Sequence, residues 1–160
     1  TPLIASSYAH NIWRYEQPIP KSFIDQGDEG IRRFFNLMNV TVVTAHEPYW
    51  RKYFMERSAE YKEISRQEGF ILFSRINTKP SYVIEGEAVD IRQDTNSAHL
   101  TPRSERVVLS FKYFPFIKSS DCTIKPFFAA PDLTLIELSG CTPDTSVTLE
   151  SINPLERLVS

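Results

Sequence analysis

Three acidic residues near the middle of the chain are the best candidates for general acid–base chemistry. Glu85 and Glu87 flank Gly86, and Asp90 follows three residues after Glu87. On a strand the two glutamates would share a face, and glycoside hydrolysis needs two carboxyl groups about 5–10 Å apart. Gly86 between them favours a bulge or turn with solvated acids instead. A small hydrolase that uses these carboxylates is therefore the least favoured hypothesis for the function of the chain.

The sequence contains none of the common nucleophile, nucleotide-binding or zinc-binding motifs. The patterns GxSxG, GxxxxGK[ST], GxGxxG and HExxH are all missing, and His46-Glu47 is followed by Pro48 without a second histidine at the required spacing. The remaining histidines, His10 and His99, lie in separate segments, which favours structural or surface roles. We therefore predict no catalytic residues, no metal ligands and no cofactor, and so an isolated domain that is not itself an enzyme.

Aromatic residues offer a binding chemistry instead. Tyr49 and Trp50 precede Arg51, and Tyr113 lies in a run of aromatic residues. Such rings can stack on sugars beside a few directed polar groups. The competing interpretation is core packing, since aromatics make up 12% of the chain and the spacing of Phe111 and Tyr113 suits one buried strand face. We keep Tyr49, Trp50, Arg51 and Tyr113 as candidate glycan contacts.

The two cysteines, Cys122 and Cys141, lack the spacing of a zinc site and are either disulfide-bonded or two buried thiols. The segments Val107–Phe116, Thr123–Ala129 and Leu133–Leu138 read as three strands of an antiparallel meander. In that meander Cys122 opens the second strand and Cys141 follows the third. Both then lie near one end of the sheet, where their Cα atoms can approach to the roughly 4.4–6.8 Å that a disulfide requires. We therefore predict a bond and an oxidising, extracytoplasmic compartment.

The first half of the chain contains the helical patterns. Residues 1–26 read as an extended lead-in, and helices are expected over Asp28–Leu37 and Pro48–Arg57 from acidic N-terminal residues, Pro48 and apolar spacing. Asn39–Thr44 reads as a buried strand, so we discount the glycosylation sequon at Asn39. Tyr61–Ile64 and Phe70–Ile76 are expected to form a hairpin.

The second half reads as short strands separated by turn residues, with Asp94–Ser104 as an exposed polar loop. This pattern is typical of a sandwich or half-barrel. We predict an α+β fold: a small α/β N-terminal portion with two short helices (1–77), packed on a mostly antiparallel, sandwich-like portion (78–160), with one shared core.

Composition narrows the classes of partner. Eighteen Lys and Arg against 20 Asp and Glu give a net charge of −2, without the basic excess of a nucleic-acid binder. No stretch approaches the roughly 20 apolar residues of a membrane-spanning helix.

Four segments together resemble large bacterial polytopic membrane proteins of the glycosyltransferase C type and their uncharacterised relatives. In these proteins a short helix runs into "NVkYvvt", a hairpin follows, and then come a strand "vvvs..yyPgW" and a strand that ends in a small-residue turn. The matching segments are Gly30–Ala45, Tyr61–Arg75, Glu105–Lys118 and Leu133–Gly140. The sequence departs from the pattern at Phe116, which stands in place of Gly-Trp, and at Ser120-Asp121-Cys122, in place of an Asp-Gly turn.

The resemblance implies a domain outside the membrane, on the C-terminal side of a helical bundle and excised at Thr1. The family's catalytic acids lie in loops near the start of the full protein, so none can be assigned here. We expect a non-catalytic extracytoplasmic accessory domain of a glycosyltransferase-like membrane protein, on the periplasmic or cell-surface face. Its partners would be its own transmembrane portion and a glycan or lipid-linked sugar. The alternative is an independent secreted β-sandwich module that binds a protein partner.

Overall fold

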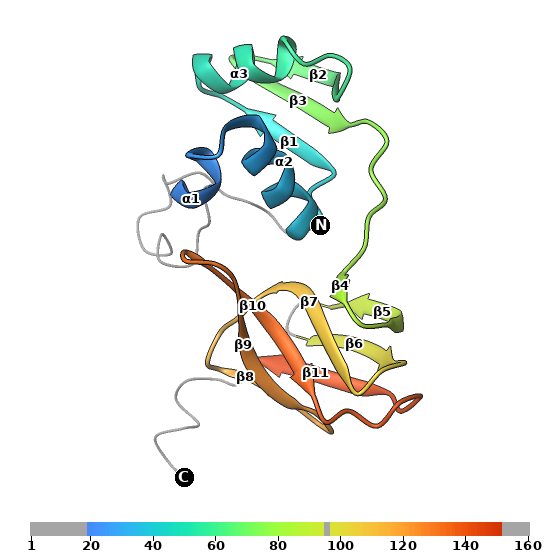
Figure 1. Ribbon diagram of the computed structural model, residues 1–160. Coiled ribbons are helices and arrows are strands. Elements are labelled where there is room, and N and C mark those ends of the chain that lie inside the picture. Colours follow the sequence, from blue (N-terminus) through green and yellow to red (C-terminus); the bar gives the residue numbers. More distant parts are fainter. Residues whose placement is uncertain (1–18, 95–96, 152–160) are drawn as a thin grey trace. The chain divides into compact units, whose positions relative to one another are not determined.

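The computed structural model describes residues 19–94 and 97–151, and their contacts divide the chain into two compact units. The first, here called the helical unit, comprises residues 31–80, and the second, the β unit, comprises 19–30 and 81–151. The division falls inside one helix, after Gly30. In chain order the elements are α1 (Lys21–Ile24), α2 (Gly27–Leu37), β1 (Val42–Ala45), α3 (Pro48–Met55), β2 (Tyr61–Gln67), β3 (Phe70–Arg75), β4 (Val83–Glu85), β5 (Ala88–Gln93), β6 (Ser97–Pro102), β7 (Arg106–Lys112), β8 (Ile117–Ser119), β9 (Thr123–Ala130), β10 (Leu133–Ser139) and β11 (Val147–Ser151) (Figure 1).

The described residues confirm the α+β class, with a small helical part and antiparallel, sandwich-like sheets. The helical unit has a three-stranded antiparallel sheet in the order β1-β3-β2. The β unit has two four-stranded sheets, in the orders β4-β7-β10-β9 and β5-β6-β11-β8, and every pairing in them is antiparallel.

Local sequence explains where the two longer helices begin and end. Asp28 and Glu29 occupy the first turn of α2, where carboxylates favour the positive end of the helix. The helix ends where Asn39 adopts a positive φ of 53°, which asparagine tolerates better than most residues. Pro48 starts α3, where its missing N–H costs nothing. Both predicted helices are present.

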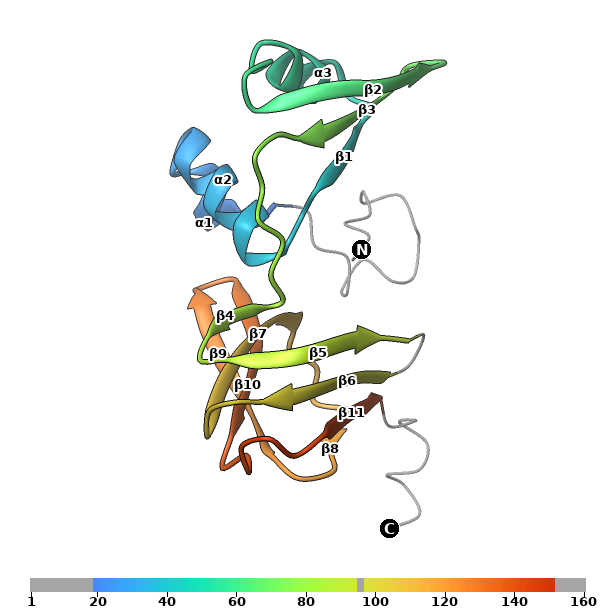
Figure 2. The ribbon, with the colours of Figure 1, turned by 90° about the vertical axis from the view of Figure 1, so that its right-hand side faces the viewer.

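Aromatic rings form the interior of the helical unit. Phe35 of α2 and Phe54 of α3 lie 6.3 Å apart, and both contact Tyr61 of β2, with ring centroids at 6.5 and 4.8 Å. Phe54 also packs against Phe73 of β3 at 5.5 Å. Because both helices reach the same strand residues, α2 and α3 cover the same face of this sheet (Figure 2).

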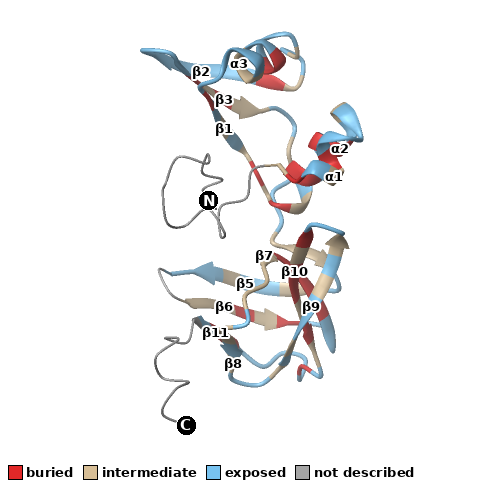
Figure 3. Cartoon of the chain, turned by 90° about the vertical axis from the view of Figure 1, so that its left-hand side faces the viewer, coloured by how far each residue is buried: buried red, intermediate tan, exposed pale blue. Residues whose placement is uncertain are grey.

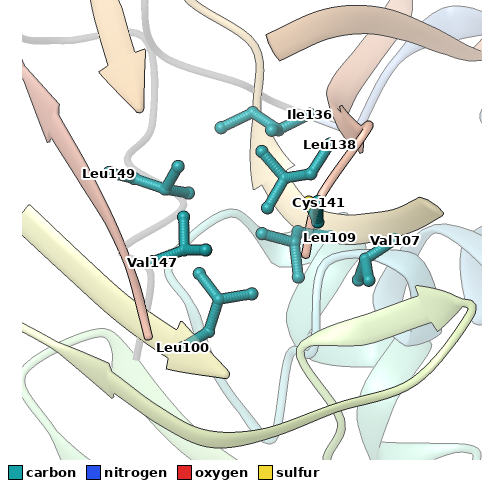
Figure 4. Packing of buried hydrophobic residues seen from close by; sticks show 8 residues of the cluster. All are labelled: Leu100, Val107, Leu109, Ile136, Leu138, Cys141, Val147 and Leu149. Carbon is teal, nitrogen blue, oxygen red and sulfur yellow. The ribbon is translucent and has the colours of Figure 1, made fainter. Parts of the chain in front are cut away.

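The core of the β unit lies between its two sheets. Leu109 of β7 and Leu138 of β10 are fully buried and belong to the same cluster as Leu100 of β6 and Val147 of β11 (Figure 4). The buried members are Leu100, Val107, Leu109, Ile136, Leu138, Cys141, Val147 and Leu149. Residues 107–110 are all buried, so β7 is covered on both of its faces (Figure 3).

Two strand predictions in the β unit are wrong. The segment Asp94–Ser104 is not an exposed loop, because Ser97–Pro102 forms β6, with Leu100 only 1% exposed. The run Val107–Phe116 is not one strand, since β7 ends at Lys112 and the chain crosses to the other sheet at β8. The meander order is also wrong, because β10 lies between β7 and β9.

Two predictions for the first part of the chain also need correction. Lys21–Ile24 forms α1 rather than extended chain, and the rest of the expected lead-in, residues 1–18, lies outside the described residues. The strand β1 begins only at Val42 and is a partly exposed edge strand, not a buried one. The Asn39 sequon therefore lies in the turn that ends α2, so our reason for discounting it does not hold.

Candidate functional site

The exposed end of the aromatic cluster on α3 is the best candidate binding site. Tyr49 is 65% exposed, and its ring meets that of Trp50 edge to face at 5.1 Å. Trp50 is half-buried, since its ring stacks on Phe54 at 5.9 Å and meets Tyr53 edge to face at 5.4 Å. The buried rings thus fix Trp50, which in turn supports an exposed tyrosine face.

Cationic residues lie on the same helix as the aromatic site and directly after it. Arg51 is half-buried next to Trp50, and Lys52 is exposed and forms a surface ion pair with Glu56 at 3.7 Å. Further along the helical unit, the Arg57 guanidinium lies 3.8 Å from the centre of the Tyr53 ring and donates to the Tyr53 carbonyl. This helix therefore carries both an exposed ring and hydrogen-bond donors, which is the composition of a small polar-ligand site.

Tyr113, the fourth candidate contact, belongs to the β unit. Its ring is half-buried and packs against the core between the two sheets, and its backbone N–H donates to the Thr134 carbonyl. Phe111 packs against the same core and stacks on Tyr82 at 5.3 Å. The structure therefore joins Tyr49, Trp50 and Arg51 on one helix and places Tyr113 in the other unit.

The three acidic residues of the hydrolase hypothesis lie around a corner where the chain passes from one sheet of the β unit to the other. Glu85 ends β4 and Asp90 lies within β5, and Gly86 between the strands has a φ of 77°. The Glu85 carboxylate accepts from the Arg106 guanidinium at 2.6 Å. Arg106 also pairs with Glu137 at 2.7 Å. The hydrogen bonds to the two carboxylates raise the pKa of Arg106, and the one to Glu137 has the larger effect. Glu85 thus holds β4 to its neighbours.

A polar cluster around His99 was not found from the sequence. His99 Nδ1 lies 3.0 Å from the Thr148 hydroxyl, and Nε2 lies 3.3 Å from the Ser97 hydroxyl and 3.5 Å from the Asp94 carboxylate. These contacts join β6 to β11 on a sheet surface where the His99 side chain is 40% exposed. In the sequence, Ser97, His99 and Thr101 alternate with Ala98 and Leu100, which is a strand pattern. The predicted loop Asp94–Ser104 conceals this pattern. We assign the cluster a structural role.

Cys122 and Cys141 are disulfide-bonded, with Cα atoms 4.7 Å apart. The bond follows from the β9–β10 hairpin alone, because Thr123 pairs with Ser139 at its open end. The prediction of this bond is unaffected by the wrong strand order, in which β7 was expected next to β9. A disulfide fits an oxidising environment outside the cytoplasm.

No protein-family model matches the chain, and no curated protein or solved structure is significantly similar to it. Within residues 19–94 and 97–151, no helix is long and apolar enough to cross a membrane. The same residues contain no group of three or more His, Cys, Asp or Glu side chains arranged to hold a metal ion.

Charge is distributed unequally between the units, a property that the whole-chain total conceals. Residues 31–80 carry nine Lys and Arg against five Asp and Glu, a net +4. The β unit, residues 19–30 and 81–151, carries seven against thirteen, a net −6. The helical unit, which contains the aromatic site, is therefore suited to neutral or anionic ligands.

Proposed function

We propose that the chain is a non-catalytic extracytoplasmic accessory domain of a glycosyltransferase-like integral membrane protein, and that it contacts glycan or acceptor through α3. The observation that carries the proposal is the supported, 65% exposed Tyr49 ring on Trp50, next to Arg51. A sugar ring has an apolar C–H face that packs on an aromatic ring, and hydroxyl edges that accept from cationic donors. The disulfide supports the location outside the cytoplasm, and the resemblance supports the membrane-protein context.

Tyr113 is not part of the proposed glycan contact. Because it belongs to the β unit and packs on that unit's core, it stabilises the sandwich more than it offers a free ring. We therefore assign the glycan contact to Tyr49, Trp50 and Arg51 alone.

Calorimetric titration with a panel of neutral and acidic oligosaccharides tests the glycan contact. We expect heat from at least one glycan and a loss of affinity of about tenfold or more in Tyr49→Ala, because stacked aromatic rings contribute roughly 1–3 kcal/mol. Phe128→Ala is the matched control, since Phe128 is 72% exposed but lies in the β unit. No heat from any glycan, or equal losses in both variants, would remove the glycan contact from the proposal.

The second candidate function is an independent secreted module that binds a protein partner. The observation in its favour is Phe128, the most exposed large apolar side chain among the described residues. It lies on the edge strand β9, and an exposed aromatic ring at a sheet edge suits a protein interface. A natural polypeptide that begins near Thr1 and is released from the cell would favour this candidate over the first.

A further inference from the structure

The sheet of the helical unit has one face that no described helix covers. The helices α2 and α3 both pack on the face that contains Tyr61 and Phe73, so the alternate strand residues point away from them. We call these residues the outer face. From the pairing register they are Val42, Thr44, Lys62, Ser65, Gln67, Phe70, Leu72 and Ser74.

The outer face combines apolar side chains with one cationic side chain, that of Lys62. Phe70 is 49% exposed and Val42 is 41% exposed. Leu72, two residues after Phe70 on β3, is half-buried. Lys62 is exposed on β2, and the imidazole of His46 lies 4.6 Å from the Phe70 ring. None of the outer-face residues is acidic. The nearest acid on β2, Glu63, points to the helix side, where it pairs with Arg66 at 2.8 Å.

Exposed apolar side chains are concentrated in the same unit. Six of the nine large apolar side chains that are exposed among the described residues belong to residues 31–80. They are Val42, Tyr49, Met55, Ile64, Phe70 and Ile76. Among them Ile64 is 54% exposed at the bulge of β2, next to Ser65 of the outer face. Val42 and Phe70 belong to the outer face, whereas Tyr49 and Met55 lie on α3, on the other side of the sheet. Large apolar side chains that are exposed on one face indicate an interaction surface.

We propose that the outer face binds the surface of an anionic phospholipid bilayer. Phe70, Val42 and Leu72 would enter the interfacial layer, and Lys62 would contact the lipid phosphates. The net +4 belongs to the unit as a whole, and it attracts the unit to an anionic surface at longer range. Charge complementarity selects this partner over a neutral one. A sheet face without directed acid–base pairs suits a fluid array of headgroups better than a specific protein. The proposal goes beyond the glycan contact and does not depend on it.

Vesicle co-sedimentation of the intact, oxidised chain tests the proposal. The vesicles are phosphatidylcholine alone, and phosphatidylcholine mixed with phosphatidylglycerol. We expect binding to the mixed vesicles that weakens as salt is added, because headgroup attraction is screened. Phe70→Ser and Lys62→Glu should each lower the apparent affinity about fivefold or more.

The matched controls are Phe128→Ser and Lys125→Glu, which remove an exposed ring and reverse an exposed charge in the β unit and should bind like the unchanged protein. Circular dichroism of every variant confirms that it is folded, and the salt dependence of the unchanged protein needs no variant. Absence of binding to mixed vesicles, equal binding to neutral vesicles, or equal losses in the control variants would overturn the proposal. A dimer on size-exclusion chromatography that Phe70→Ser dissociates, without vesicle binding, would assign the face to a second copy instead. Failure here leaves the glycan titration unaffected, so the two proposals are tested separately.

Discussion

Removal of the disulfide should destabilise the β unit and leave the helical unit unchanged. The bond joins residues that are 19 positions apart at the open end of the β9–β10 hairpin, and Cys141 is only 3% exposed within the core cluster. Chain-entropy arguments give about 3 kcal/mol for a closed loop of this length. A double replacement by alanine, Cys122→Ala with Cys141→Ala, avoids a buried hydroxyl and a free thiol, so the loss reports mainly on the lost crosslink.

Peptide-resolved hydrogen exchange is the suitable assay because it reports on each unit separately. A loss of about 3 kcal/mol corresponds to an increase in exchange of about a hundredfold for β10 amides that open with the unit. Peptides from β3, in the helical unit, should exchange as in the unchanged protein, and the unchanged protein treated with reductant should match the double variant. An increase of less than about tenfold in β10 would refute the crosslink argument. Equal acceleration in β3 would refute the independence of the two units.

Three further substitutions test the packing and electrostatics. Leu109→Ala removes a fully buried side chain between the sheets and should cost about 2–5 kcal/mol, measured by chemical denaturation. Gly86→Ala should lower the midpoint of thermal unfolding, because a Cβ there would lie 2.2 Å from the Arg106 carbonyl oxygen at a φ of 77°. Burial, opposed by the nearby Arg75, raises the pKa of Tyr61, so folding stability should be present below about pH 10 and be lost as the pH rises through the higher folded-state pKa. Tyr61→Phe should abolish this alkaline loss in pH-dependent denaturation.

Local signals predicted the helices, whereas strand pairing depended on residues far apart in the chain. Asp28, Glu29 and Pro48 act within one turn of their own helices, so both helices were recognised from sequence. The central position of β10 was not recognised, although the run Leu133–Leu138 has apolar residues on both faces of the strand, Leu133 and Leu135 on one and Ile136 and Leu138 on the other. Such a run is typical of a strand that is covered on both faces, and this property predicts a central rather than a terminal position.

The missed strand β6 shows how polar outward residues can conceal a core strand. Its inward side chains are Ala98, Leu100 and Pro102, and only Leu100 is a large apolar residue. His99 and its neighbours on the outer side dominate the composition of the segment, so it was read as a loop. The pairing with β11, through the contact of His99 with Thr148, supplies what the local sequence does not show.

The candidate site was predictable in residue type but not in arrangement. The sequence places Tyr49, Trp50 and Arg51 together, and a helix was expected to carry them. Their exposure depends on how Phe54 packs against Phe73 of β3, which no local pattern encodes. The charge asymmetry of the two units was likewise invisible in a whole-chain net charge of −2.

The central proposal is that this domain is part of a larger membrane protein, and cell fractionation of its natural source tests it most directly. An antibody raised against the chain would be used to probe membranes washed with alkaline carbonate, the soluble fractions and the medium. We expect a polypeptide well above 18.5 kDa that stays with the washed membranes. A species of about 18.5 kDa in the medium or a soluble fraction, with nothing in the washed membranes, would contradict the proposal.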